Sequence, residues 1–206
     1  MDALPNFEKF CDGAERSDLE KIKHELDMHY EPLRRLLGNE EILALRHYKN
    51  MGYKEMNDLM RNYTIPGMND YALEMIENMV DRVKIAFSGQ TLPFSTVTYR
   101  GLKREYPPAD LAVGDYLTDL AFMSTTLSAR FARQVCLWET NVVPSTIYEI
   151  SVPEGTPAIW LDGILNKDEY ELLLGYGTTV HISAINDLAG YPGRRYVRCQ
   201  CVQLKI

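Results

Sequence analysis

The feature that most constrains the fold is a single change of hydrophobic period near residue 90. Up to about residue 88, apolar side chains recur every three or four positions, which is the spacing of amphipathic helices. From about residue 94, runs of β-branched and aromatic residues alternate with turn residues, which is typical of strands. Helices followed by strands predict an α+β fold, with the helices segregated from a mainly antiparallel sheet.

Four helices are expected in the first part of the chain. Ser17–Glu20 has the Ser-x-x-Glu pattern of a capping box, which predicts the start of the first helix. Asn39 is expected to cap the second helix, and Gly52 to end it. Asn69 or Asp70 would cap the fourth. The predicted helices cover residues 17–36, 39–52, 53–63 and 69–87.

Seven strands are expected after residue 93, with one short helix among them. This helix is placed at Leu127–Glu139, because Phe131 and Val135 recur at helical spacing behind Ser128, the candidate cap. Gly190–Gly193 is expected to form a hairpin loop. The predicted strands cover residues 94–101, 121–126, 146–152, 158–161, 169–174, 178–185 and 195–206.

The chain is expected to hold one principal domain. Its 206 residues can bury a sizeable core without disulfide or metal staples. We place this domain at residues 39–206, with a helical lead-in to about residue 88 and a β core from about residue 94. Residues 1–38 are expected to form a helical N-terminal extension.

The charge balance excludes some classes of function. The 22 Lys and Arg residues are outnumbered by 29 Asp and Glu, so the net charge of −7 provides no general field to attract nucleic acid or an anionic membrane. No apolar run is long enough to span a bilayer, and the N-terminus lacks the basic start and apolar stretch of a signal peptide. We therefore expect no nucleic-acid partner, no membrane span and a cytosolic site of action.

The four cysteines do not suggest a disulfide framework, because they are few and scattered. Cys199 and Cys201 alternate along an expected strand, so their side chains share a face. Two thiolates without a further Cys or His nearby make a poor metal site. Buried, reduced thiols and no metal are therefore expected.

Two polar segments stand at the ends of expected strands. Arg100 ends the first strand beside Gly101, and its guanidinium has the planar fork of donors that binds phosphate oxygens in pairs. A solvated arginine at a strand end is the simpler interpretation. Ser124, Thr125 and Thr126 supply consecutive hydroxyls, which equally well cap a following helix or satisfy a sheet edge.

A pair of carboxylates forms the third segment. A period of two places Glu169 and Glu171 on one face of the expected strand. Like charges so close destabilise the fold unless a cation lies opposite or both are solvated. Solvation is the simpler interpretation, but the leucines at 172–174 draw Glu171 toward the core.

Taken in order, the Arg, the Ser-Thr-Thr and the Glu-x-Glu resemble the arginine–serine–glutamate class of mono-ADP-ribosyltransferases, a fold shared by many bacterial toxins and effectors. The resemblance extends over about residues 40–206. Tyr53–Arg61, which contains Asn57 and Leu59, resembles the segment that precedes the Arg strand in such domains. Thr126 departs from the Ser that is commoner in the family. The resemblance implies a mainly antiparallel, two-sheet β core and a catalytic domain at 39–206.

The resemblance also implies that NAD is the co-substrate, with no metal. Arg100 would hold the NAD phosphates and ribose, with the backbone of Gly101 close to the nicotinamide amide. Thr125 and Thr126 would shape the nicotinamide pocket. Phe131 is a candidate to pack on the nicotinamide or adenine end, although a core position is equally expected for this aromatic residue.

Two glutamates would carry the chemistry. Ser124 would orient Glu171, which would bind the nicotinamide-ribose hydroxyl and stabilise the positive charge that develops as the bond to nicotinamide breaks. Family members with Glu rather than Gln two residues before the catalytic Glu typically modify arginine, so the resemblance implies an arginine acceptor through Glu169. The chemistry agrees, because a protonated guanidinium needs a carboxylate to pair with it and take up a proton during attack. The loop 162–168 would meet the acceptor protein.

Three functions remain open from the sequence. The leading one is transfer of ADP-ribose from NAD to an arginine of a target protein, by a bacterial effector delivered into a host cytoplasm or by an intracellular phage protein. An NAD glycohydrolase would use the same residues with water as acceptor. A non-catalytic module that binds a partner through its helices is the third, although folding alone does not require Glu169 and Glu171 side by side.

Overall fold

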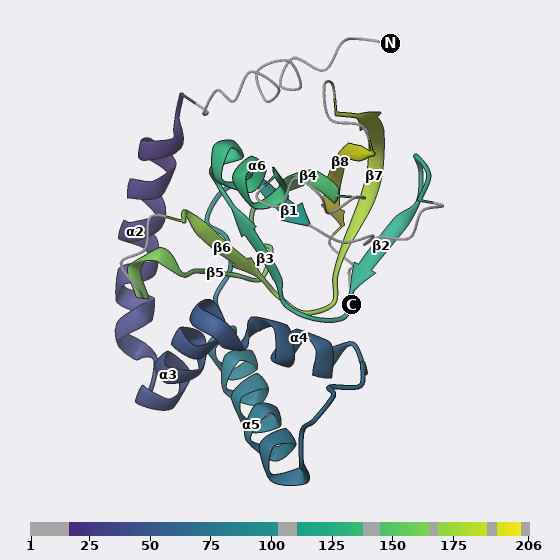
Figure 1. Cartoon of the computed structure of the whole chain (residues 1–206). Coiled ribbons are helices and arrows are strands. Elements are labelled where there is room, and N and C mark those ends of the chain that lie inside the picture. Colours follow the sequence, from purple (N-terminus) through teal and green to yellow (C-terminus); the bar gives the residue numbers. More distant parts are fainter. Residues whose placement is uncertain (1–16, 103–110, 138–144, 165–168, 189–192, 203–206) are drawn as a thin grey trace.

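A computed structural model describes residues 17–102, 111–137, 145–164, 169–188 and 193–202 (Figure 1). The helical part comes first in the chain and the sheet second, so the α+β prediction is confirmed. The helices are α2 (Leu19–Leu36), α3 (Asn39–His47), the π-helical turn η1 (Tyr48–Gly52), α4 (Tyr53–Met60), α5 (Asp70–Ala86), α6 (Ala129–Leu137) and the 3₁₀ turn η2 (Asp162–Ile164).

The strands form a mixed sheet with the order β2-β7-β8-β4-β1-β3-β6-β5, in which the β4–β8 pair is parallel and the others are antiparallel. β1 and β3 are joined through one residue pair, Tyr99 and Thr126. The predicted two-sheet core thus consists of two halves of one hydrogen-bonded sheet. The strands are β1 (Thr96–Leu102), β2 (Tyr116–Asp119), β3 (Met123–Thr126), β4 (Ser145–Val152), β5 (Ala158–Trp160), β6 (Glu171–Leu174), β7 (Thr178–Asp187) and β8 (Arg194–Val202).

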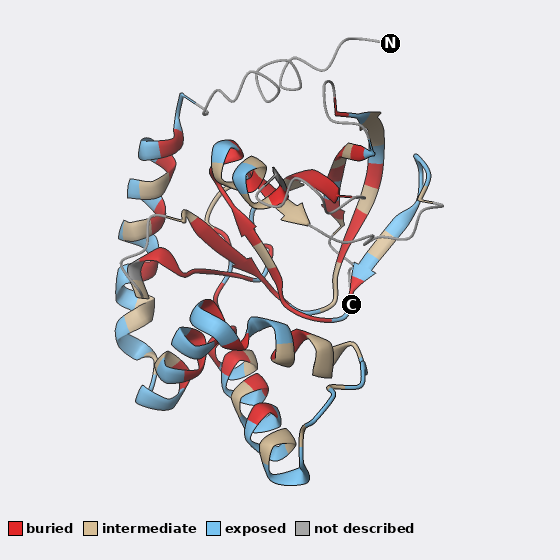
Figure 2. Ribbon diagram, in the orientation of Figure 1, coloured by how far each residue is buried: buried red, intermediate tan, exposed pale blue. Residues whose placement is uncertain are grey.

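The helices cover the β3-β6-β5 half of the sheet from two sides. α2 lies beside β5 (Figure 1), where the Tyr30 hydroxyl donates to the carbonyl oxygens of Thr91 and Ala158 at 3.1 and 2.9 Å. α3, α4 and α5 pack together on the other side, where Leu45 and Met56 share a core with Leu173 of β6. The buried faces of the helices turn toward the sheet (Figure 2). β6 is therefore held between helices, which fixes the residues at its start.

The first two helix starts differ from the expected ones. α2 has Asp18 at its N-cap without a side-chain cap hydrogen bond, so the capping box of Ser17–Glu20 does not form. The glutamate of that pattern instead accepts a hydrogen bond from the Tyr170 hydroxyl at 2.9 Å. Gly38, and not Asn39, occupies the N-cap of α3. α2 thus begins one residue later than the capping pattern predicts, and α3 begins one residue earlier.

The prediction that Gly52 ends a helix is wrong. Gly52 keeps helical backbone angles, and η1 connects α3 to α4. Two other predicted caps are confirmed: the Asn69 side chain accepts from the Ala72 N–H at 2.9 Å, and the Ser128 hydroxyl accepts from the Phe131 N–H at 3.0 Å. Both satisfy backbone donors that the first turn of a helix leaves free.

Two strand predictions need correction. β2, an edge strand, carries no buried apolar run and was not expected. β6 begins at Glu171 and not at Glu169, because Tyr170 has a left-handed φ of 51°, which interrupts strand pairing. The prediction that strand alternation places Glu169 on the same face as Glu171 is therefore wrong.

The thiols of Cys199 and Cys201 are free and buried on β8, as predicted. Several expectations fall, wholly or in part, on residues outside the described ranges. These are the extension at 1–16, the end of the short helix at 138–139, the acceptor loop at 165–168, most of the hairpin loop at 190–192 and the chain end at 203–206.

Candidate active site

Ser124 and Glu171 meet across neighbouring strands. β3 and β6 pair so that Ser124 faces Leu173 and Thr126 faces Glu171. The Ser124 hydroxyl donates to Glu171 Oε1 at 2.6 Å. Leu172, like the two leucines after it, is fully buried, so β6 enters the core with Glu171 at its edge. The structure thus brings together two of the predicted motifs.

The two threonines of the hydroxyl triplet bond to the backbone. Thr125 Oγ1 donates to the Leu172 carbonyl at 2.6 Å, and Thr126 Oγ1 donates to the Glu169 carbonyl at 2.7 Å. Thr126 also accepts from the Ser128 N–H at 3.0 Å. These bonds fix the turn before β6 and the start of α6, which explains why hydroxyls are present at both positions.

The two predicted glutamates converge on a lysine from the helical part. Lys49 of η1 has its Nζ 3.3 Å from Glu171 Oε2, 3.7 Å from Glu169 Oε2 and 3.0 Å from Asp162 Oδ1. Its side chain is 1% exposed. A cation therefore faces the pair, and the simpler interpretation, in which both carboxylates are solvated, does not hold for Glu171.

Asp162 anchors the backbone around these glutamates. Its Oδ2 accepts from the Tyr170 N–H at 2.7 Å, and its Oδ1 accepts from the Glu171 N–H at 3.0 Å. Asp162 lies in η2, directly after β5. The same carboxylate therefore fixes the left-handed turn at Tyr170 and pairs with Lys49.

Burial dominates the titration of the inner glutamate. It raises the pKa of Glu171 above its ordinary value and outweighs Lys49 and Ser124, which both favour the charged form, while Glu169 raises the pKa further. Burial alone would lower the pKa of the Lys49 ammonium, but the neighbouring carboxylates, with Glu171 foremost, leave it above its ordinary value. The charged state of Glu171 thus depends on its cationic partner.

Arg100 belongs to a second buried charge cluster. Its Nη1 donates to Asp119 Oδ2 at 3.2 Å, and Arg61 holds the same carboxylate with two hydrogen bonds of 2.9 and 2.8 Å. Asp119 is fully buried, and although burial alone would raise its pKa, the two guanidinium groups lower it. Two arginines around one aspartate leave a positive excess, which suits an anionic ligand.

Tyr48 connects the two clusters. It is buried in η1, where its hydroxyl accepts from the Asn57 side-chain amide at 3.0 Å. Burial is the main cause of its raised pKa, but Glu171, Arg100 and Asp119 also act on it electrostatically. Arg100 and Glu171 are therefore both close enough to this buried tyrosine to act on its titration.

Close packing explains the glycine at position 101, and sequence analysis did not predict this contact. A Cβ at this position would lie 2.3 Å from the Ala132 carbonyl oxygen, so the glycine allows α6 to approach β1 closely. Phe131 lies half-buried on α6. Its contact with NAD stays a prediction.

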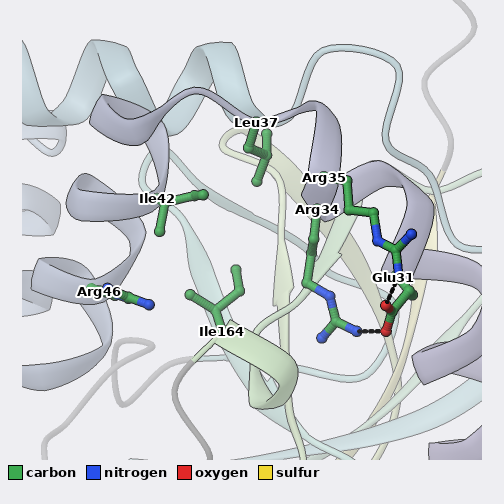
Figure 3. Close-up of a pocket in the computed structure, with 7 residues that line it drawn as sticks. All are labelled: Glu31, Arg34, Arg35, Leu37, Ile42, Arg46 and Ile164. Atoms are coloured by element: carbon green, nitrogen blue, oxygen red, sulfur yellow. Dashed lines mark hydrogen bonds and ion pairs between the residues drawn. The ribbon is translucent and has the colours of Figure 1, made fainter.

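A separate hollow of about 280 Å³ lies between α2, α3 and η2 (Figure 3). None of the predicted site residues lines it. The hollow adjoins the candidate site at η2, which contributes Ile164 to the hollow and Asp162 to the site. Its lining consists of Glu31, Arg34, Arg35, Leu37, Ile42, Arg46 and Ile164.

Sequence analysis missed the site roles of four charged residues: Lys49, Arg61, Asp119 and Asp162. Two of them had a signal, because Arg61 ends the segment that carries part of the family resemblance and Asp162 begins the loop expected to meet the acceptor. The other residues pair across long stretches of chain, which periodicity does not reveal.

The Ser124 hydroxyl bonds to Glu171, and an arginine cluster lies nearby. The fold that carries these residues is that of the bacterial mono-ADP-ribosyltransferases. The model of the ADP-ribosyltransferase exoenzyme family matches residues 26–204. The chain therefore belongs to this family, as the resemblance predicted. No protein among the curated sequences matches the chain significantly. None of the described helices is long and apolar enough to cross a membrane.

Solved structures of toxins share the fold. BECa, from a binary enterotoxin of C. perfringens, was solved with NADH and is 20% identical with a TM-score of 0.70; the match covers 90% of this chain and 48% of BECa, so this chain spans about half of that protein. Plx2a from Paenibacillus larvae is 19% identical over 91% of this chain and 98% of its own, with a TM-score of 0.70. Vis from Vibrio splendidus, solved with agmatine, is 19% identical over 95% of this chain and 90% of its own, with a TM-score of 0.71.

Proposed function

We propose that this protein transfers ADP-ribose from NAD to an arginine side chain of a target protein and releases nicotinamide. The observation that carries the proposal is the unequal exposure of the two glutamates beside Lys49. The Glu171 side chain is 10% exposed and bonded to Ser124, whereas that of Glu169 is 32% exposed. One carboxylate is thus placed inside the site, and the other is within reach of an incoming protein.

Arg100 and Arg61 would bind the NAD phosphates, with Asp119 holding both guanidinium groups in position. Glu171 would accept a hydrogen bond from the nicotinamide-ribose hydroxyl. As the bond from ribose C1′ to the nicotinamide nitrogen breaks, its electron pair leaves with nicotinamide, and Glu171 stabilises the positive charge left on the sugar. Ser124 would keep the carboxylate in this orientation.

The partly exposed position of Glu169 beside Lys49 supports arginine as the acceptor. A guanidinium is protonated at ordinary pH and attacks C1′ poorly in that state. Glu169 would pair with it and accept the proton that the attacking nitrogen loses. Vis, which shares the fold, was crystallised with agmatine, a small guanidinium compound.

The remaining assignments complete the proposal. Thr125 and Thr126 would shape the nicotinamide pocket through the backbone they fix, the Gly101 backbone would lie by the amide, and Phe131 would cover one end of NAD. The chemistry belongs to residues 39–206, and residues 1–38 support packing or target choice. The setting we propose is a host cytoplasm reached by a bacterial effector, or the cell in which a phage protein is made.

The test is incubation of the protein with NAD labelled in the ADP-ribose part, with agmatine or with cadaverine, a diamine without a guanidinium group, as the matched control. We expect nicotinamide release and label on agmatine, and none on cadaverine. A cell lysate with mass spectrometry then locates the modified residue. Nicotinamide release without labelling of any acceptor would identify a glycohydrolase, label on another residue type would exclude arginine specificity, and no release would exclude the enzyme.

A further inference from the structure

Lys49 comes from the helical part of the chain but lies among the carboxylates of the candidate site. Its ammonium is within 4 Å of oxygens of Asp162, Glu169 and Glu171, and almost none of its side chain is exposed. A buried lysine is costly unless paired. It lies in η1, a π-helical turn, which is a rare element that occurs frequently at functional sites. The lysine is therefore built into the site.

The two glutamates meet the same ammonium, each through its Oε2 atom. Burial and the neighbouring Glu169 both disfavour the charged form of Glu171, and a protonated Glu171 cannot stabilise a positive charge on ribose. The proposed cleavage step thus needs a cation in this place.

We propose that Lys49 is a positioning residue that holds Glu169 and Glu171 side by side and supplies the positive charge that the buried Glu171 needs in order to act on NAD. The inference rests on the proposed function in assigning NAD cleavage to Glu171. Lys49 acts through these carboxylates and does not contact substrate. No feature of the sequence around residue 49 indicates this role.

The surroundings of Glu171 decide the direction of the effect. Burial and Glu169 disfavour its charge, and Lys49 and Ser124 favour it, with Lys49 the stronger of the two. Removing Lys49 therefore raises the pKa of Glu171 further. The groups that face Glu171 are Lys49 and Tyr48 from η1, Ser124 from β3, Asp162 from η2 and Glu169 from the turn before β6.

The first experiment is the pH profile of nicotinamide release for the wild type and Lys49→Met. Activity is lost on the acid side as Glu171 takes up a proton. In Lys49→Met this loss should occur about one to three pH units higher, the usual effect of an opposite charge at this distance. Lys54→Met, which removes an exposed lysine paired with Asp58, is the matched control and should leave the profile unchanged. An unchanged acid limb in folded Lys49→Met overturns the proposal.

A second pair of variants, both carrying Glu169→Gln, tests the proposal if Lys49→Met does not fold. Glu169→Gln removes the neighbouring negative charge, so the Lys49→Met/Glu169→Gln variant leaves fewer unpaired charges in the site. Its activity should be lost on the acid side at a higher pH than that of Glu169→Gln alone. If the double variant and Glu169→Gln lose activity at the same pH on the acid side, the proposal is overturned.

A direct measurement separates this inference from the proposed function. Titration of ¹³C-labelled glutamate carboxyls by NMR, with Glu171→Gln to assign the signal, gives the Glu171 pKa without any turnover. A wild type that releases no nicotinamide would exclude the proposed function, and the NMR comparison would still decide the role of Lys49. We expect a higher Glu171 pKa in Lys49→Met, or in the double variant compared with Glu169→Gln. An equal pKa in these comparisons would contradict the role of Lys49.

Discussion

The two charged clusters of the site are built in opposite ways. Around Arg100, two guanidinium groups surround one buried carboxylate, Asp119. Around Glu171, carboxylates surround one buried ammonium, that of Lys49. The first cluster has an excess of positive charge, which suits an anionic substrate. The second has an excess of negative charge, which suits a developing cation.

The comparison also shows what the helical part contributes. Lys49 in η1 and Arg61 at the end of α4 each supply a charge that a residue of the β core needs. The helices therefore complete the electrostatics of the sheet as well as covering it. We expect changes in the carboxylate cluster to act on catalysis, and changes in the arginine cluster to act on binding and stability.

The largest effect is expected from Glu171→Gln. The amide keeps the shape of the side chain but loses the charge that stabilises the sugar cation. Nicotinamide release should fall on the order of a hundredfold or more. Steady-state rates at saturating NAD measure this, with Glu154→Gln on the surface as the matched control. Retained activity would remove Glu171 from the catalytic role.

Asp119→Asn should break the arginine cluster. It leaves two largely buried guanidinium groups without their counter-charge, which should cost about 3 kcal/mol in the free energy of unfolding. Because the fold holds the Asp119 pKa below its unfolded value, this stabilisation is present above the unfolded pKa of about 3.9 and is lost as pH falls through the folded pKa. Urea unfolding between pH 3 and 7 measures both, with exposed Asp115→Asn as control. Equal losses in the two variants would contradict this account.

Arg100→Ala should act on affinity more than on stability. Arg61 still holds Asp119 with two hydrogen bonds after this change. The loss of a charge-assisted contact of about 1.5–3 kcal/mol corresponds to roughly a tenfold or larger rise in the NAD dissociation constant. Calorimetry measures it, with exposed Arg130→Ala as control. Wild-type affinity in Arg100→Ala, or a large fall in its melting temperature, would show that Arg100 is structural.

The smallest effect is expected from Tyr30→Phe in α2, because the Tyr30 hydroxyl bonds to backbone carbonyl groups and not to a charge of either cluster. Its hydroxyl bonds to the carbonyl oxygens of Thr91 and Ala158, so the loss should be about 1–2 kcal/mol of stability. Thermal unfolding gives the change, with exposed Tyr71→Phe as control. Nicotinamide release per folded molecule should be unchanged, and a lower rate would assign α2 a part in catalysis.

Local signals in the sequence predicted the order of helices and strands, and the caps at Asn69 and Ser128. The contact between Ser124 and Glu171 was implied by the family resemblance and not by local signals. These features depend on neighbours in the chain or on a recognisable set of motifs.

The rest of the site depends on contacts between distant residues. Lys49 pairs with Asp162, 113 positions away, and Arg61 with Asp119, 58 positions away. In the sequence, such a lysine looks like part of a solvated helix face. The left-handed turn at Tyr170 was not expected either, because Asp162 stabilises it from outside the segment. Glu169 therefore joins Glu171 through a shared cation and not through strand alternation.

The most direct test of the account is the ratio of transfer to hydrolysis in Glu169→Gln. If Glu171 acts on NAD and Glu169 on the acceptor, this variant should lose labelling of agmatine far more than it loses nicotinamide release without acceptor. Both rates are measured in parallel for the wild type and for Glu171→Gln, which should lose both activities. An equal proportional loss of the two activities in Glu169→Gln would contradict the division of roles between the two glutamates. It would also contradict the assignment of arginine as the acceptor.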